Sequence, residues 1–293
     1  MKFETNFDKY DLSNVGKMEE CYKKVEPLLY NSNILGVIED LRYYKEKNVR
    51  NHTEDDLSSC NDKIFYPQEI LDPYLGIKGW YDSKENTFYI NSDAIKEPSF
   101  SKDYPTPLNF GGVGYTIAYE IVHAFDNKNY KLKLRGDYEN KYNVTDWSIK
   151  NFQNRSDCFV EKYGMQNESI TNKNINGTLT LNENIADNGG LKLAHRAYMK
   201  YLKEIGGKDI EVPAYNQYTD EQLFFISAGR KHCTYKSKDK LENQKKTDKH
   251  PPGEIRTNMA LSYYKPFYDA FKCSYNRKMN LKGKDKCELW KNH

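Results

Sequence analysis

Apolar residues recur every three or four positions in four stretches of the chain, which is the spacing of one face of a helix. These predicted helices cover residues 18–48, 112–127, 181–202 and 221–231. In the second, the apolar side chains form a stripe at intervals of four residues: Val113, Ile117, Ile121 and Phe125. Gly189-Gly190 lies inside the third and predicts an interruption of that helix.

A short strand is predicted at residues 87–91, where Thr-Phe-Tyr-Ile-Asn follows a polar, turn-like segment. Residues 236–249 contain almost only charged and amide side chains, and they predict a solvated surface loop. The whole pattern predicts a mostly helical α+β fold, with a small sheet beside the 112–127 helix.

The composition indicates a folded protein. Mean hydropathy is −0.93, but 14% of the residues are aromatic, including 25 Tyr, and a disordered chain rarely contains so much buriable surface. The formal net charge is +3, from 45 basic and 42 acidic residues. A chain so nearly balanced provides no electric field that would favour nucleic acid or an anionic membrane as a partner.

Two features are typical of proteins outside the cell. Six cysteines form no Cys-x-x-Cys metal pair, and five Asn-x-Ser/Thr sequons begin at Asn51, Asn143, Asn154, Asn167 and Asn176. The first residues lack the apolar core of a signal peptide, and no run of 18 or more apolar residues exists. We therefore expect an extracellular or cell-surface ectodomain whose N-terminal export segment is missing from this chain.

Glu120 and His123 match part of a zinc-binding helix pattern. Residues 119–123 read Tyr-Glu-Ile-Val-His, which is His-Glu-x-x-His with Tyr119 in place of the first His. In the intact pattern, two imidazoles one turn apart hold zinc, and the Glu acts as general base on the zinc-bound water. Taken alone, Glu-x-x-His on an apolar helix more often marks an ordinary buried His.

Two later segments carry side chains that suit such a site. Glu183 and Asp187 lie one turn apart on the third predicted helix, as a metal ligand and a carboxylate that orients a ligating His would. His250 lies in a Pro-rich turn, and Arg256 follows six residues later. A His and an Arg near a metal can stabilise the oxyanion of a tetrahedral intermediate and bind a peptide carbonyl.

In this order, the segments resemble the neprilysin and endothelin-converting-enzyme family of zinc endopeptidases. The resemblance covers roughly residues 75–290. It includes Leu-Asn-Phe-Gly-Gly at 108–112, His-Ala-Phe-Asp at 123–126, Glu-Asn-Ile-Ala-Asp-Asn-Gly-Gly at 183–190, Gln-Leu-Phe-Phe at 222–225 and Cys-Glu-Leu-Trp at 287–290.

The resemblance implies roles for individual residues. The zinc ligands would be His123 and Glu183. The catalytic residues would be Glu120 as the base, His250 as the transition-state His, and Asp187. The carboxylates behind the ligands would be Asp126 and Asp187. The substrate-binding residues would be Arg256, Trp80 and Tyr81.

The resemblance also implies one zinc ion, peptide substrates and a zincin-like metallopeptidase domain over residues 75–293, after a partial helical segment over residues 1–74. Membrane attachment would come only through an N-terminal anchor missing from this chain. A disulfide is implied between Cys158 and Cys287, whereas the usual partners of Cys233 and Cys273 belong to a missing N-terminal segment. Two cysteines have no assignment, Cys21 and Cys60. We expect surface or packing roles for the histidines that match no ligand position: His52, His195 and His232.

Two departures from the family pattern lie at positions that bind zinc or substrate. The first zinc His falls on Tyr119, and a substrate-binding Asn falls on Lys78. A phenol, with an ordinary pKa of about 10, must lose its proton to bind zinc well. Lys78 removes an amide acceptor and adds a charge. Loss of a ligand's supporting partner costs about 10–100-fold in affinity or activity, so loss of a ligand should cost at least as much.

The leading hypothesis is a neprilysin-like metalloendopeptidase homologue with reduced zinc affinity and weak or lost activity, retained as a peptide-binding or decoy ectodomain. The alternative is an active zinc endopeptidase that cleaves peptides on the N-terminal side of apolar residues, with Tyr119 as an unusual ligand. A third possibility is a partial or unstable product with no folded function.

Overall fold

The computed structural model describes residues 2–5, 79–91, 94–131, 144–207, 209, 215–275, 278–281 and 283–290. The chain divides into two compact units, one formed by residues 1–3 and 78–293 and the other by residues 4–77. Several sequence predictions fall outside the described residues: the 18–48 helix, Lys78, Cys21, Cys60, His52, and the sequons at Asn51 and Asn143.

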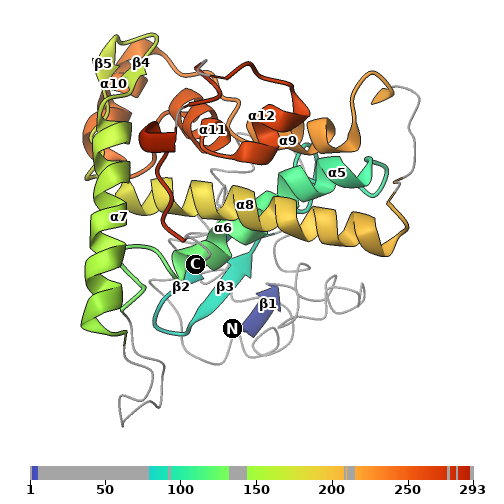
Figure 1. Cartoon of the computed structure of the whole chain (residues 1–293), viewed down its shortest axis with the longest axis horizontal. Coiled ribbons are helices and arrows are strands. Elements are labelled where there is room, and N and C mark those ends of the chain that lie inside the picture. The colour runs from blue at the N-terminus through green and yellow to red at the C-terminus, as the bar shows by residue number, and fades with distance from the viewer. Residues whose placement is uncertain are drawn as a thin grey trace, which may run out of the picture. The chain divides into compact units, whose positions relative to one another are not determined.

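Two helices, α6 (Tyr115–His123) and α8 (Leu181–Glu204), form the centre of the described unit (Figure 1). They pack unusually closely, because a Cβ atom built on Gly190 would lie only 2.8 Å from the Cα of Tyr119. A Cβ on Gly189 would lie 2.8 Å from Cγ1 of Val122. The helix α8 is continuous through both glycines, so the predicted interruption is wrong. These glycines allow two backbones to approach rather than breaking the helix.

The helical segment around α6 differs from the predicted 112–127 helix. It begins earlier, with α5 (Thr106–Asn109) and a π-helical turn, η2 (Phe110–Gly114), and α6 ends at His123. The predicted apolar stripe is not the buried face, since Phe125 is 55% exposed and the other three residues of the stripe are only half-buried. The apolar residues buried on α6 are Tyr115, Ala118, Tyr119 and Val122. Its contact with α8, rather than the apolar stripe, determines which face is buried.

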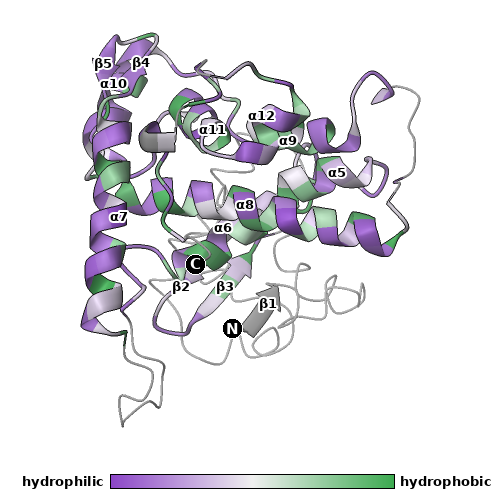
Figure 2. Cartoon of the chain, viewed as in Figure 1, coloured by the Kyte–Doolittle hydropathy of each residue, from purple (hydrophilic) through white to green (hydrophobic). Residues whose placement is uncertain are grey.

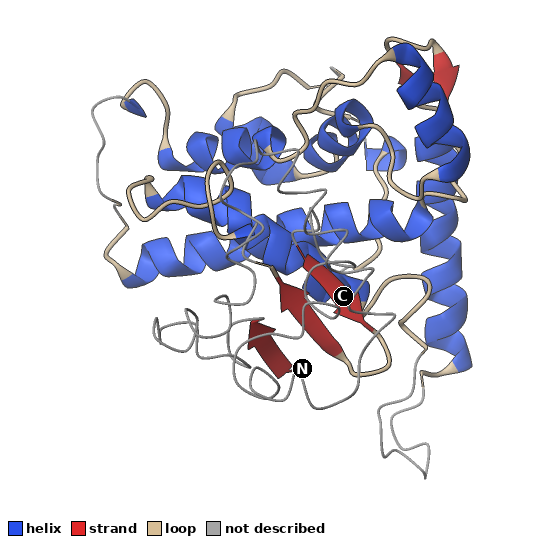
Figure 3. Cartoon of the chain, turned by 180° about the vertical axis from the view of Figure 1, so that it is seen from behind, coloured by secondary structure: helices blue, strands red, loops and turns tan. Residues whose placement is uncertain are grey.

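The other helices enclose this pair. The long helix α7 (Asp146–Gly164) crosses one end of α8, and α9 (Asp220–Arg230), α11 (Gly253–Ser262) and α12 (Lys265–Ala270) lie on the side of α8 opposite the sheet (Figures 1 and 3). A short 3-10 turn, η4 (Gly283–Asp285), follows near the C-terminus. The predicted 221–231 helix is confirmed as α9. No helix among the described residues is both long and apolar enough to cross a membrane.

A small sheet lies beside α6, as predicted. β2 (Gly79–Asp82) and β3 (Thr87–Ile90) form an antiparallel hairpin in which Trp80 faces Tyr89, and β1 (Lys2–Thr5) completes the order β1-β3-β2. The predicted strand at 87–91 is therefore confirmed as β3. A second hairpin joins β4 (Asn167–Glu168) and β5 (Lys173–Asn174).

The predicted surface loop at 236–249 is instead largely a helix, α10 (Lys238–Thr247). Ser237 caps its first turn by accepting a hydrogen bond from the backbone N–H of Lys240. Leu241 and Gln244 are buried, and they anchor a segment that is otherwise hydrophilic (Figure 2). One cap and two buried side chains thus accompany helix formation in a sequence dominated by charge.

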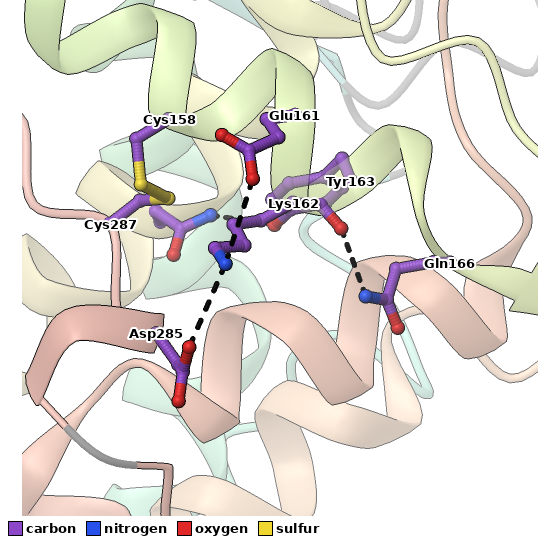
Figure 4. Close-up of a disulfide and its surroundings, with 8 residues drawn as sticks. Cys158, Glu161, Lys162, Tyr163, Gln166, Asp285 and Cys287 are labelled. Carbon is purple, nitrogen blue, oxygen red and sulfur yellow. Dashed lines mark hydrogen bonds and ion pairs between the residues drawn. A yellow bond between two sulfur atoms is a disulfide. The ribbon is translucent and has the colours of Figure 1, made fainter.

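A disulfide joins α7 to the end of the chain (Figure 4). Cys158 pairs with Cys287 across a sequence separation of 129 residues, as the resemblance implied. Nearby, the ammonium of Lys162 lies 3.7 Å from a carboxylate oxygen of Asp285. Closing a loop of this length removes unfolded-state entropy worth about 5 kcal/mol in the chain-entropy model. The other described cysteines, Cys233 and Cys273, are free thiols.

His195 connects α8 to its neighbours inside the core. Its Nδ1 lies 2.8 Å from the hydroxyl of Tyr264, its Nε2 lies 2.9 Å from a carboxylate oxygen of Glu221, and its ring stacks on Phe225. The side chain has the packing role expected for it. Burial lowers the pKa of His195 to about 4, so this imidazole is neutral in the folded protein at neutral pH.

We predict that the free energy of unfolding falls as the pH is lowered from 6.5 towards 4. In this window the unfolded chain binds a proton at His195 that the folded chain excludes, which costs up to about 3 kcal/mol at pH 4. His195→Gln, which can keep both hydrogen bonds, should show a shallower decline in urea unfolding at about pH 7, 5.5 and 4.5. Equal declines would contradict this assignment.

We also predict that Gly190→Ala lowers the free energy of unfolding by about 1–3 kcal/mol, because the new methyl group meets backbone atoms of Tyr119. Gly114→Ala is the matched control, since its Cβ would lie 3.5 Å from the nearest atom. The control should be neutral or stabilising by less than about 1 kcal/mol. Urea unfolding measures both, and similar losses in the two variants would argue against close helix packing as the cause.

Candidate active site

Glu120 and His123 lie on α6 and both are buried, Glu120 close to β2 and His123 against α8. Nδ1 of His123 is 2.8 Å from Oδ2 of Asp126, which leaves Nε2 facing α8. The other oxygen of Asp126 accepts hydrogen bonds from the backbone N–H groups of Lys128 and Asn129. The carboxylate that orients His123 is therefore itself fixed by the turn that ends α6.

The acid–base character of Glu120 is set mainly by its surroundings. Burial raises the pKa of its carboxyl group, and the nearby His123 and Lys231 oppose that rise. A carboxylate with a raised pKa accepts a proton more readily at neutral pH than an exposed one. Its environment therefore suits a general base.

Glu183, on the first turn of α8, is fully buried and contacts several side chains. Its Oε2 accepts a hydrogen bond from the hydroxyl of Tyr119, and it lies 3.5 Å from Nε2 of His123 and 3.3 Å from Nε2 of His250. Its Oε1 lies 2.8 Å from the amide nitrogen of Asn182 and 2.9 Å from the ammonium of Lys249. Protein donors thus contact both oxygens of this carboxylate.

Tyr119 lies between the two candidate ligands. Its ring meets that of His123 edge-on, with centroids 4.7 Å apart, and its hydroxyl reaches Glu183. Cationic groups lie near the ring: the ammonium of Lys231 is 4.5 Å from its centroid, and the guanidinium of Arg256 is 5.3 Å from it. The phenol therefore serves as a hydrogen-bond donor in a cation-rich environment.

Asp187 and Arg256 form a buried two-point ion pair behind this cluster. Nε of Arg256 donates to Oδ2 at 2.6 Å, and Nη2 donates to Oδ1 at 2.7 Å. Burial alone would raise the pKa of Asp187, but Arg256 and His232 lower it to about 2. The hydroxyl of Tyr115 also donates to Asp187, either to the backbone oxygen of Asp187 or to its carboxylate. In this structure, Asp187 orients Arg256 directly, whereas the predicted ligand-orienting contact, with the imidazole of His123, is made by Asp126.

His250 follows α10 and is half-exposed. The backbone N–H of His250 donates to a carboxylate oxygen of Asp248 at 2.8 Å. The same oxygen lies 2.9 Å from Nδ1 of His250. Its Nε2 is thereby directed at Glu183. The predicted transition-state His thus reaches the same carboxylate as His123.

The predicted substrate-binding residues Trp80 and Tyr81 lie on β2, which passes close to Glu120. A Cβ built on Gly79 would lie 3.3 Å from Cγ of Glu120. The ring of Trp80 stacks on Tyr89 at 4.6 Å, and the hydroxyl of Tyr81 donates to the side chain of Asn86. Both side chains therefore contact their own hairpin.

Three site residues were not predicted from the sequence: Lys231, His232 and Lys249. Nε2 of His232 is buried 3.7 Å from Oδ1 of Asp187, and burial together with Arg256 lowers its pKa well below the ordinary value. Lys231 lies against the rings of Tyr115 and Tyr119. The available signals were that Lys249 is adjacent to His250, and that Lys231 and His232 directly follow the apolar stretch of α9.

The fold is that of zinc metalloproteases. It superimposes on the inhibitor complex of the Mycobacterium tuberculosis zinc metalloprotease Zmp1 with a TM-score of 0.64 and 24% identity, over 73% of this chain and 32% of that one. PepO from Lactobacillus rhamnosis gives a TM-score of 0.59 at 25% identity, over 72% of this chain and 31% of that one.

The sequence gives the family. Residues 78–287 match the model of Peptidase family M13, and the chain belongs to that family. It is 35% identical to Neprilysin-11 of Caenorhabditis elegans, over 73% of this chain and 25% of that protein. It is also 35% identical to human membrane metallo-endopeptidase-like 1, over 76% of this chain and 29% of that protein. Rat endothelin-converting enzyme 1 is 32% identical over 73% and 27%. The chain thus spans about a quarter to three tenths of these relatives' length.

A family of zinc metalloproteases implies a zinc ion, but the residues here do not fit one in the usual way. Of three expected ligands, only His123 and Glu183 have the expected chemistry, and the third position holds a protonated phenol that donates to Glu183. Among the described residues, no group of three or more His, Cys, Asp and Glu side chains is arranged to hold a metal.

We predict that Arg256→Lys lowers the free energy of unfolding by about 2 kcal/mol, because lysine cannot make the two-point contact with the buried Asp187. Arg230→Lys is the control, since Arg230 is exposed, donates to the backbone oxygen of Pro98, lies over the ring of Tyr104 and pairs with no carboxylate in a two-point contact among the described residues. Its effect should stay below about 0.5 kcal/mol. Equal losses in urea unfolding would show that the ion pair does not contribute specifically to stability.

Proposed function

We propose that this chain is an M13 peptidase domain that binds zinc weakly and hydrolyses peptides weakly or not at all. The observation that carries the proposal is the hydrogen bond from Tyr119 to Glu183, which joins the replaced ligand to a remaining one. A zinc ion would have to break this bond and compete with a proton on the phenol. Both requirements lower the affinity relative to an imidazole at position 119.

The residues around Tyr119 support the inference that this cluster derives from a zinc site and is not an unrelated group of buried polar side chains. His123 keeps its carboxylate partner, Asp126, and Arg256 keeps its two-point contact with Asp187. Glu120 is buried nearby with a raised pKa. The replaced ligand therefore lies within a framework of otherwise suitable residues, and restoring one side chain is a meaningful test.

Peptide binding can persist without hydrolysis. Among the described strands, β2 stands at one end of the order β1-β3-β2 and passes Glu120 closely, and a strand at the end of a sheet can pair with an extended peptide backbone. We propose that this edge binds peptides, as ligands or weakly cleaved substrates. This fits the idea of a peptide-binding or decoy domain.

We further propose an extracellular or cell-surface location. Three sequon asparagines among the described residues are exposed and could carry glycans: Asn154, Asn167 and Asn176. The disulfide between Cys158 and Cys287 suits an oxidising compartment. Peptide digestion of the protein produced in a secreting host, with and without glycan removal, tests occupancy of these sites.

We predict that the wild-type chain binds zinc at least about 10-fold more weakly than a Tyr119→His variant. Titration calorimetry against zinc and metal content after dialysis measure this difference directly. Tyr119→Phe is the matched control, because it removes the hydroxyl without adding a ligand and should not raise affinity. Equal zinc affinity in the wild type and Tyr119→His would contradict the proposal.

A cleavage assay with peptides that contain apolar residues completes the test. The wild type should show little zinc-dependent cleavage. Robust cleavage that Glu120→Gln abolishes, at unchanged metal content, would overturn the proposal and establish a working endopeptidase.

A further inference from the structure

We propose that Lys249 is a built-in counter-ion of Glu183, which neutralises this buried carboxylate in the absence of metal and opposes zinc at the same site. This inference rests on the proposed function, since it explains how a weakened zinc site stays folded. It assigns a role to a residue that lies outside the pattern of ligands and catalytic groups.

The argument begins with the cost of burying a charge. The side chain of Glu183 has no exposed surface, and an ionised carboxylate in such a place needs hydrogen bonds and an opposite charge nearby. In a zinc protease the metal supplies that charge. Here the hydrogen bonds come from Tyr119 and Asn182, which are neutral donors.

Lys249 supplies the positive charge in direct contact, while the guanidinium of Arg256, which is paired with Asp187, also interacts electrostatically with Glu183. Its ammonium lies 2.9 Å from Oε1 of Glu183, on the oxygen that does not face His123 and His250. The lysine side chain itself is 52% exposed. The ion pair therefore joins a partly solvated cation to a buried anion, so that the lysine itself loses little hydration.

The backbone of His250, the residue after Lys249, is held in place by two hydrogen bonds. Asp248 accepts a hydrogen bond from the backbone N–H of His250, and the side chain of Gln244 donates to the backbone oxygen of His250 at 3.0 Å. Gln244 is one of the two buried anchors of α10. The turn that carries the ammonium is thus fixed by contacts that do not involve Glu183.

Zinc and Lys249 are expected to oppose each other. A divalent cation held by Glu183 would share the carboxylate with the ammonium of Lys249, and like charges so close repel each other. Zinc must bind against this repulsion or displace the lysine side chain into solvent. Removing Lys249 should therefore weaken the metal-free fold and strengthen metal binding.

The first test is the melting temperature in the presence of a chelator. Lys249→Met should lower it by about 5 °C or more, whereas Lys249→Arg, which keeps the charge, should lower it by less than about 2 °C. The matched control is Lys173→Met, because Lys173 makes an ion pair of similar length, 3.0 Å, with the more exposed Glu242. The control should change the melting temperature by less than about 2 °C. Equal effects of the two Met substitutions would overturn the proposal.

Removing the carboxylate charge provides a second measurement if Lys249→Met does not fold. In the Glu183→Gln background, the same lysine substitution should shift the melting temperature by less than about 2 °C, because no buried charge remains to neutralise. A shift as large as about 5 °C in that background would overturn the proposal.

The third measurement concerns zinc in the Tyr119→His background. There, added zinc should raise the melting temperature more when Lys249→Met is also present, with at least about 3-fold tighter binding by calorimetry. Equal affinity with and without Lys249 would refute its opposition to the metal. Zinc-dependent cleavage by the wild type would instead refute the proposed loss of function, so the two failures are distinguishable.

Discussion

The backbone contact between α6 and α8 determines the positions of the main site residues. Gly190 allows the helices to meet at the distance where His123 and Tyr119 from one contact Glu183 from the other. Such closeness places two carboxylates of α8, those of Glu183 and Asp187, where water cannot solvate them. Each then needs a cation from another part of the chain, and α11 provides one while the turn after α10 provides the other. Helix packing thereby creates an electrostatic requirement that two distant segments satisfy.

Local patterns in the sequence were sufficient to predict the helices that correspond to α6, α8 and α9, the strand β3 and the fold class, but not α7, α11 or α12. They were misleading where tertiary contacts decided the outcome. The apolar stripe ending at Phe125 was conspicuous, but α8 covers a different face that includes Tyr115 and Tyr119. The charged segment of α10 gave little sign of helicity, because only Leu241 and Gln244 bury side chains there. A Gly-Gly pair indicates either a break or a close approach, and sequence alone does not distinguish them.

At the site, too, the residues themselves were easier to predict than their contacts. The resemblance identified the residues that the structure brings together: His123, Glu183, Asp187, His250 and Arg256. Their partners could not all be predicted. Asp126 and Asp187 were both expected behind the ligands; Asp126 contacts His123, whereas the contact of Asp187 with Arg256 was not predicted. Lys249 had only its position beside His250 as a signal, since a lysine in a charged run is usually solvated.

The disulfide has a consequence for the integrity of the molecule. The covalent ring that it closes runs from Cys158 to Cys287 and contains all of α8 to α12, including Glu183 and His250. A protease that cuts one peptide bond inside this ring opens the chain without separating its pieces. Such a nicked molecule would migrate as one species until a reductant is added, and its two fragments would remain tethered around the packed helices. The ring therefore protects the site from dissociation after a single break in the surrounding chain.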